Sequence, residues 1–165
     1  MLYAAYGSNL HPLRLARRVS SAEFVGTGFL PDWSLHFHKR GADGSGKGNV
    51  LSGGEGVHVA VFEISADDKL ILDGIEGTGY SAAFLEVPTL GDCFSYVADE
   101  SHIDGTLAPY DWYKELVSIG AQMHGFPASY LNRIDAIETC QDPVSERRKM
   151  QWASVHQIKS NGRGL

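Results

Sequence analysis

The stretch Tyr3-Ala4-Ala5-Tyr6-Gly7-Ser8-Asn9-Leu10 starts as a short apolar strand and breaks into a glycine-containing turn. A Gly-Ser-Asn corner ahead of a helix leaves backbone N–H groups without carbonyl partners, and such donors favour a carboxylate, a phosphate or a developing oxyanion. Spacing alone supports equally well an ordinary strand–helix connection capped by Asn9, because Asn is a common N-cap residue. The turn is therefore predicted to be an anion-binding corner or a capped connection.

Composition limits the classes of protein to which this turn can belong. The chain has 165 residues, 43% of them hydrophobic, so one domain with one sizeable core is expected. The 20 acidic and 14 basic residues give a formal net charge of −6, which argues against nucleic acid or an anionic membrane as partner. A local basic patch stays compatible with this charge. No apolar run could cross a bilayer and no signal-like start is seen, so we expect a cytoplasmic protein.

The cysteines and two neighbouring histidines indicate neither a disulfide framework nor a metal site. Cys93 and Cys140 fall in different predicted elements without metal-ligand spacing, so both are expected to be free thiols. His36 and His38 lie two residues apart on one face of a predicted strand, but no third ligand lies at a diagnostic distance. We therefore predict no bound metal, and the sequence leaves the oligomeric state open.

The glycine-rich segment Gly41-Ala42-Asp43-Gly44-Ser45-Gly46-Lys47-Gly48 comes within one residue of a phosphate-binding P-loop. That motif needs Ser or Thr after its lysine and a helix starting there, whereas Gly48 follows Lys47 and residues 49–54 cannot support a helix. We therefore reject nucleotide binding and interpret the segment as a mobile connection between strands.

Hydrophobic periodicity predicts strands in the first two thirds of the chain and helices toward its end. The segments 22–30 and 33–38 are interpreted as a pair, as are 82–90 and 93–98. The full set of predicted strands is 2–6, 22–30, 33–38, 57–64, 82–90 and 93–98, and the predicted helices are 11–19, 66–76, 110–124 and 127–137. Since β–α alternation is not sustained, we expect an α+β fold with a mixed, partly closed β-barrel and helices outside it.

The segment Leu72-Asp73-Gly74-Ile75-Glu76-Gly77 places a carboxylate where a helix is predicted to stop. A negative charge at that end opposes the helix dipole, so Glu76 is a candidate for proton transfer rather than a stabilising residue. The ordinary interpretation is an exposed helix-terminal glutamate. Asp73 is the competing carboxylate, three residues earlier on nearly the same face.

Three ordered blocks resemble the γ-glutamylcyclotransferase-like proteins, a group that includes γ-glutamylamine cyclotransferases. They are residues 6–10, residues 72–77 with Tyr80 soon after, and residues 109–138. The resemblance spans residues 2 to about 138 and implies a small mixed β-barrel with flanking helices. We accordingly predict a domain at 1–140 and a polar, partly flexible C-terminal extension at 141–165.

The resemblance implies an enzyme that cyclises a small γ-glutamyl amide to 5-oxoproline and releases an amine or amino acid, without a cofactor. Glu76 would be the catalytic acid and base. The substrate-binding residues that the resemblance implies are Tyr6, Gly7, Ser8, Asn9, Leu10, Tyr80 and Tyr113. One departure concerns residues 81–84, Ser-Ala-Ala-Phe, where many relatives place arginines, so the choice of substrate stays open.

Other functions remain compatible with these residues. One is an enzyme of the same fold that removes the amide or acyl group of another γ-glutamyl metabolite. Another is an inactive module that binds a small metabolite in the same cavity. A hydrolase with Ser8 as nucleophile is a further alternative, although Gly7 and Asn9 do not give the Gly-x-Ser-x-Gly pattern.

Overall fold

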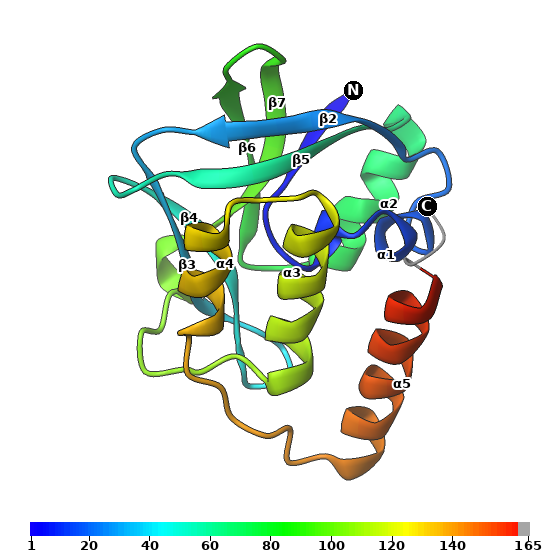
Figure 1. The fold of residues 1–165 in the computed structure, drawn as a ribbon, viewed down its shortest axis with the longest axis vertical. Coiled ribbons are helices and arrows are strands. Elements are labelled where there is room, and N and C mark those ends of the chain that lie inside the picture. Colours follow the sequence, from blue (N-terminus) through cyan, green and yellow to red (C-terminus); the bar gives the residue numbers. More distant parts are fainter. Residues whose placement is uncertain (162–165) are drawn as a thin grey trace.

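Strand β1 (Leu2–Ala5) is the central strand of a five-stranded sheet in the computed structural model (Figure 1). The strand order is β2-β5-β1-β7-β6. Strand β1 pairs antiparallel with β5 (Val57–Glu63) and parallel with β7 (Gly91–Ala98), while β2 (Glu23–Leu30) and β6 (Tyr80–Val87) form the edges. The apolar opening of the chain is thus buried between two neighbours, and the turn that follows it starts inside the molecule.

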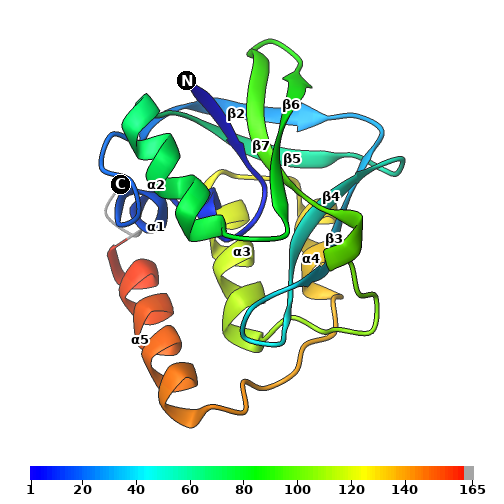
Figure 2. The same ribbon diagram turned by 180° about the vertical axis from the view of Figure 1, so that it is seen from behind.

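The two edges of the sheet approach each other without pairing among the described strands. A Cβ atom on Gly28 of β2 would lie 2.2 Å from a methyl carbon of Val87 on β6, so a glycine is needed for this approach. The predicted α+β class is confirmed. The sheet is strongly curved rather than closed into a barrel, as Figure 2 shows from behind.

A separate two-stranded sheet corrects one predicted pairing. Strand β3 (Trp33–Arg40) pairs antiparallel with β4 (Gly46–Ser52), whereas the segment interpreted as its partner, β2, pairs with β5. Alternating apolar residues identify a strand but not its neighbour, which is why the pairing was wrong. The glycine-rich segment predicted to be mobile supplies the start of β4, and Gly46 allows the carbonyl oxygen of Phe37 to lie where a Cβ would stand.

Helix α2 (Ala66–Glu76) forms as the sequence predicts. The Ser65 hydroxyl accepts a hydrogen bond of 3.1 Å from the Asp68 N–H at its start. Gly77 ends it with a φ of 67°, a conformation that glycine adopts without strain. Glu76 is therefore the last residue of the helix.

The opening turn forms a short 3₁₀ helix, η1 (Ser8–Leu10), which leads into α1 (Pro12–Ala16). Asn9 is not the cap of α1, as one interpretation of the turn had it. The imidazole Nδ1 of His11 accepts a hydrogen bond of 3.2 Å from the Leu13 N–H and caps the helix instead. The Asn9 side chain is thereby free to point elsewhere.

Helices α3 (Asp111–Met123) and α4 (Ala128–Asp135) match the predicted helix pair. The structure describes residues 1–161, which end in a helix that the sequence did not predict, α5 (Ser145–Asn161). This helix lies beside α3 with its end near α1 (Figure 1), and it buries Val155 and Ile158. Residues 162–165 of the predicted flexible extension lie outside the described part. Within residues 1–161 no helix is long and apolar enough to span a bilayer.

Gly120 of α3 lets the opening turn pack directly against the helix backbone, because it has no side chain. A Cβ atom at this position would lie 2.6 Å from the Cβ of Leu10 and 3.0 Å from the backbone nitrogen of His11. We expect Gly120→Ala to lower the free energy of unfolding by about 1–3 kcal/mol, because overpacking displaces the backbone. Gly74→Ala on α2, where a Cβ would meet nothing within 4 Å, should instead raise it by about 0.5–1 kcal/mol. Urea denaturation of both variants checks this, and equal stabilities would contradict the close approach.

Candidate active site

A cavity of about 310 Å³ lies between the opening turn and the C-terminal end of α2. Its floor comes from β1 and β7, and β4 contributes backbone to one wall. The lining residues are Tyr3, Tyr6, Gly7, Ser8, Asn9, Gly48, Glu76, Tyr80, Tyr96 and Tyr113. The structure thus brings together the predicted site residues from three distant parts of the chain, with Leu10 as the exception.

Glu76 points into this cavity and is held there by two donors. The Asn9 amide Nδ2 donates to Oε1 of Glu76 at 3.0 Å, and the Arg18 guanidinium donates to the same oxygen at 3.1 Å. The Glu76 side chain is 19% exposed, so the carboxylate is largely withdrawn from solvent. Within residues 1–161 no donor contacts Oε2, and this oxygen is therefore the one available to exchange a proton.

Two tyrosine hydroxyls have donor capacity left for a ligand. The Tyr3 hydroxyl accepts from the Asn9 amide at 3.1 Å, and the Tyr113 hydroxyl accepts from the Gly48 N–H at 3.0 Å. Neither hydroxyl donates to another described residue. Burial raises the pKa of Tyr3 and of Tyr113 above the ordinary value, so both keep their protons.

The three other tyrosines of the cavity donate to the protein. The Tyr6 hydroxyl donates to the Tyr96 carbonyl oxygen, the Tyr80 hydroxyl donates to the Gly48 carbonyl oxygen, and the Tyr96 hydroxyl donates to Asp73 at 2.6 Å. Tyr80 therefore serves as a wall of the cavity, whereas Tyr113 keeps a free hydroxyl proton. Asp73, the competing carboxylate, is engaged by Tyr96 and by Lys69 at 2.9 Å.

The turn itself offers backbone donors next to Glu76. Ser8 and Asn9 are the first residues of η1, and residues at the start of a helical turn have no carbonyl partner within it for their N–H groups. Both residues are nearly buried and line the cavity. Leu10 does not join them, because its side chain is fully buried in the core beneath α3.

Ser8 lacks the partner that a nucleophilic serine needs. Within the described residues its hydroxyl has no hydrogen bond to a histidine or to any other base. A serine hydroxyl is a weak nucleophile without such activation. The arrangement therefore offers a carboxylate that can exchange a proton, Glu76, but no activated nucleophile among residues 1–161.

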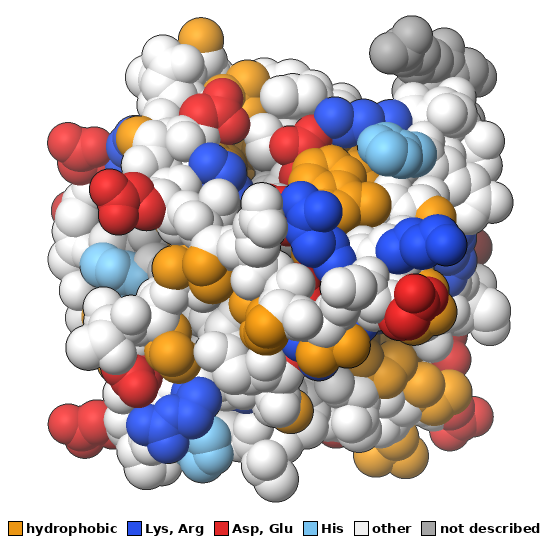
Figure 3. All heavy atoms as spheres, turned by 90° about the horizontal axis from the view of Figure 1, so that it is seen from below, with side chains coloured by type: hydrophobic (Ala, Val, Ile, Leu, Met, Phe, Trp, Pro, Cys, Tyr) orange, Lys and Arg blue, Asp and Glu red, His pale blue; other side chains and the backbone are white. Residues whose placement is uncertain are grey.

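The small cavity opens into a larger cleft of about 1250 Å³ that shares Ser8, Glu76, Tyr80 and Tyr113 with it. The cationic side chains that line this outer cleft are Arg14, Arg18, Lys39, Arg40 and Lys47, and its one carboxylate is Glu76. On the face drawn in Figure 3, basic and acidic side chains are interspersed. The excess of positive charge is thus a property of the cleft and contrasts with the net charge of −6 of the chain.

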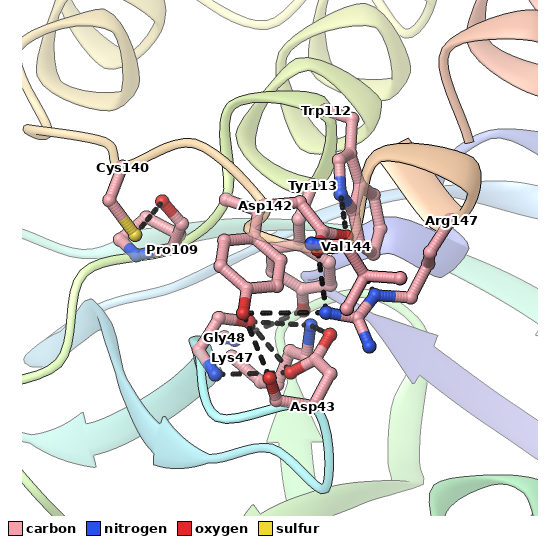
Figure 4. A network of polar contacts seen from close by, with 12 residues as sticks. Asp43, Lys47, Gly48, Pro109, Trp112, Tyr113, Cys140, Asp142, Val144 and Arg147 are labelled. Atoms are coloured by element: carbon pink, nitrogen blue, oxygen red, sulfur yellow. Dashed lines mark hydrogen bonds and ion pairs between the residues drawn. The ribbon is translucent and has the colours of Figure 1, made fainter. Parts of the chain in front are cut away.

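Lys47 of the outer cleft lies in a group of polar contacts that extends to Arg147 of the C-terminal helix (Figure 4). Its Nζ donates to Asp43 at 2.7 Å and lies 4.6 Å from the centre of the Tyr113 ring. Burial alone would raise the pKa of Asp43, but the hydrogen bond from Lys47 and the lysine charge lower it below its usual value. Beside them, buried Asp142 accepts from Arg147 of α5 at 2.6 Å. Asp142 also accepts from the Trp112 indole at 3.2 Å, so these contacts connect α5 to the start of α3, which carries Tyr113.

Several residues at the site were missed by the sequence analysis. In the sequence, Tyr3 and Tyr96 are indistinguishable from other strand residues that face the core. Gly48 lies in the segment interpreted as a mobile connection. Arg14 and Arg18 belong to a predicted basic helix, but no local pattern links them to Glu76, which is 58 residues from Arg18. The net charge of −6 is compatible with a local basic patch but does not indicate where one lies, so the sequence did not predict the outer cleft.

The cap of α1 makes the neighbourhood of Arg14 and Arg18 sensitive to acid. Burial, followed by the charges of His124 and Arg17, lowers the pKa of His11 from 6.5 to about 4. Between these two pH values the unfolded chain binds a proton that the folded protein does not, so stability should fall as the pH is lowered from 6.5 to about 4. His11→Asn keeps a capping acceptor without the titration and should show a shallower decline. Urea midpoints across this range test it, and parallel curves would contradict it.

Comparison with known proteins identifies relatives along most of the chain. No protein-family model matches the sequence. Human γ-glutamylcyclotransferase is 29% identical over 150 residues, which cover 83% of this chain and 78% of that protein. A solved structure described as γ-glutamyl cyclotransferase superimposes with a TM-score of 0.80 at 28% identity and covers 96% of this chain and 98% of its own. Over most of its length the chain is therefore similar to γ-glutamylcyclotransferases in sequence and in fold.

A second solved structure supports this similarity. It is a crystal structure from Homo sapiens described as uncharacterized protein loc79017, with a TM-score of 0.79 and 28% identity. The alignment covers 96% of this chain and 97% of that one. The resemblance seen in the sequence is therefore confirmed, and a function of the general γ-glutamylcyclotransferase type is supported.

Proposed function

We propose that the protein cyclises a small γ-glutamyl amide to 5-oxoproline and releases the amine or amino acid, in the cytoplasm and without a cofactor. The observation that carries the proposal is the position of Glu76, held by Asn9 and Arg18 in the cavity beside the Gly7–Asn9 turn. Similarity to γ-glutamylcyclotransferases over most of the chain supports the same reaction class.

The reaction is an intramolecular acyl transfer, and it fits a site that has a base but no nucleophile. The free Oε2 of Glu76 takes one proton from the substrate's α-ammonium group. The resulting amine attacks the γ-carbonyl carbon, and a new C–N bond closes a five-membered ring. Because both reacting groups belong to one molecule, the protein has to fold and orient the glutamyl chain rather than bring two reactants together.

Collapse of the tetrahedral intermediate breaks the original amide bond. Glu76 returns its proton to the departing nitrogen as this bond breaks, and the released amine also takes up the second proton that the ring nitrogen loses. The products are 5-oxoproline and a protonated amine, so charge is conserved. A single carboxyl group that first accepts and then donates a proton suffices for the sequence.

The donors of the turn and of two tyrosines bind the oxygen atoms of the glutamyl group. The N–H groups of Ser8 and Asn9 stabilise the γ-carbonyl oxygen as negative charge develops on it. The unused hydroxyl protons of Tyr3 and Tyr113 provide further hydrogen bonds to the α-carboxylate or to the same oxygen. Tyr80 closes the cavity on the side of the outer cleft.

A panel of γ-glutamyl dipeptides and γ-glutamyl amines tests the proposal. We expect 5-oxoproline and the free amine in equal amounts from at least one member, as measured by chromatography with mass detection. Free glutamate in place of 5-oxoproline would mean hydrolysis and would favour a role for Ser8. Ligand binding without turnover on any member of the panel would favour the inactive binding module.

A further inference from the structure

The outer cleft contains two cations that form no ion pair with a carboxylate within residues 1–161. Three of its five cations are paired: Arg18 with Glu76 at 3.1 Å, Lys47 with Asp43 at 2.7 Å and Arg40 with Asp104 at 3.7 Å. Arg14 and Lys39 have no such partner among the described residues. They come from α1 and β3, elements far apart in the sequence, and both line the same cleft.

The position of Arg14 lowers the stability of the folded protein unless a ligand binds there. Its Nε atom is buried and has no hydrogen-bond partner, and the described residues provide no acceptor for the rest of the guanidinium group. Burial, with the charge of Arg18, lowers the pKa of Arg14 to about 10, so the group stays charged at neutral pH. A buried donor without an acceptor reduces stability unless something that binds there accepts its hydrogen bonds.

Lys39 is 5% exposed and likewise lacks an anion. Its Nζ donates to the Thr78 carbonyl oxygen at 3.1 Å and lies 4.5 Å from the centre of the Tyr80 ring. An ammonium group has three donors, and this contact uses one of them. Because Tyr80 also lines the inner cavity, Lys39 lies at the boundary between the two spaces.

We propose that the outer cleft binds the leaving half of the γ-glutamyl substrate and selects one with two carboxylates, an acidic amino acid such as glutamate or aspartate. This inference rests on the proposed function, which places the glutamyl half in the inner cavity. The α-carboxylate and the side-chain carboxylate of such an amino acid satisfy Arg14 and Lys39, one anion for each cation. A leaving group with one carboxylate leaves one cation unsatisfied, and a simple amine leaves both.

The isosteric pair γ-glutamyl-glutamate and γ-glutamyl-glutamine provides the test, with γ-glutamyl-methylamide as a substrate whose leaving group has no carboxylate. We expect kcat/KM for γ-glutamyl-glutamate to exceed that for γ-glutamyl-glutamine by about tenfold or more, the effect of one charge-assisted hydrogen bond. The methylamide should be the poorest of the three. Added salt should reduce the ratio for the isosteric pair, because screening weakens the charge contacts.

Two substitutions connect the preference to the two cations. Of Arg14→Gln and Lys39→Met, the variant that loses the cation of the side-chain carboxylate should bring the ratio between the isosteric substrates close to one. The other variant loses the cation of the α-carboxylate, so it should lower kcat/KM for both isosteric substrates and leave the methylamide unchanged. Arg17→Gln is the matched control, since Arg17 follows α1 at its C-cap, does not line the cleft and carries the same charge. Arg14→Gln also removes a buried unpaired donor, so we expect this variant to fold at least as stably as the parent, as thermal denaturation will show.

The outcomes separate this inference from the function on which it rests. Release of 5-oxoproline from all three substrates at similar kcat/KM would overturn the selection of acidic leaving groups and leave the proposed function intact. An equal loss on all three substrates in Arg14→Gln would place Arg14 at the glutamyl half and also overturn it. No 5-oxoproline from any substrate would overturn the proposed function itself.

Discussion

Glu76→Gln is expected to slow 5-oxoproline formation by about 10²- to 10⁴-fold, the range that general acid–base groups contribute. Glutamine keeps an oxygen that can accept from Asn9 and Arg18, so the contacts that hold the side chain are retained in part. What it loses is the ability to take a proton from the α-ammonium group and return it to the leaving nitrogen. The defect should therefore appear in kcat more than in KM.

The control for this substitution is Asp73→Asn, a carboxylate one turn earlier on the same helix. Asp73 accepts from Tyr96 and Lys69 and does not line the cavity, so its amide variant should keep most of the activity. Purified proteins should be compared by 5-oxoproline release and by thermal denaturation. Near-normal turnover in a folded Glu76→Gln variant would rule out Glu76 as the proton carrier.

The parts of the fold that the sequence predicted correctly are those set by local chemistry. The Ser65 cap and the Gly77 stop define α2 within a few residues, and they place Glu76 at the end of the helix. Strand pairing depends on contacts between distant segments, so the partner of β3 was wrong even though its alternation was clear. Helix α5 was missed because few of its residues are apolar, and Val155 and Ile158 become buried only through packing on the rest of the domain.

In the candidate site too, the residues in short sequence motifs could be predicted, and those brought together only by folding could not. Gly7, Ser8, Asn9 and Glu76 belong to short motifs, and the structure brings them to one cavity. Leu10 was included because it completes the motif, but in the structure it serves the core. The cations of the outer cleft come from α1 and the turn after it, from β3 and from β4, and only the folded chain shows that Arg14 and Lys39 form no ion pair.

Asn9→Asp is expected to cause the second largest loss of activity, about 10²-fold at neutral pH, since it disables the same proton carrier. Asn9 is 4% exposed, and its amide Nδ2 bridges the Tyr3 hydroxyl and Oε1 of Glu76. Aspartate replaces this donor with a second carboxylate at hydrogen-bond distance from the first. Two carboxylates at such a short distance share one proton at neutral pH. Glu76, which must accept the substrate's proton, is then already protonated for part of the time.

The pH dependence of the rate distinguishes this cause from a simple loss of contact. In Asn9→Asp the rising limb of the kcat/KM profile should move to higher pH, because a more alkaline solution is needed to remove the shared proton. Asn9→Ala removes the donor without adding charge, so it should lose about tenfold in rate, the value of one hydrogen bond, with a smaller displacement of the profile than Asn9→Asp. If the Asn9→Asp profile instead overlaid that of the parent protein, the contact between Asn9 and Glu76 would not control proton transfer, and the mechanism would have to dispense with it.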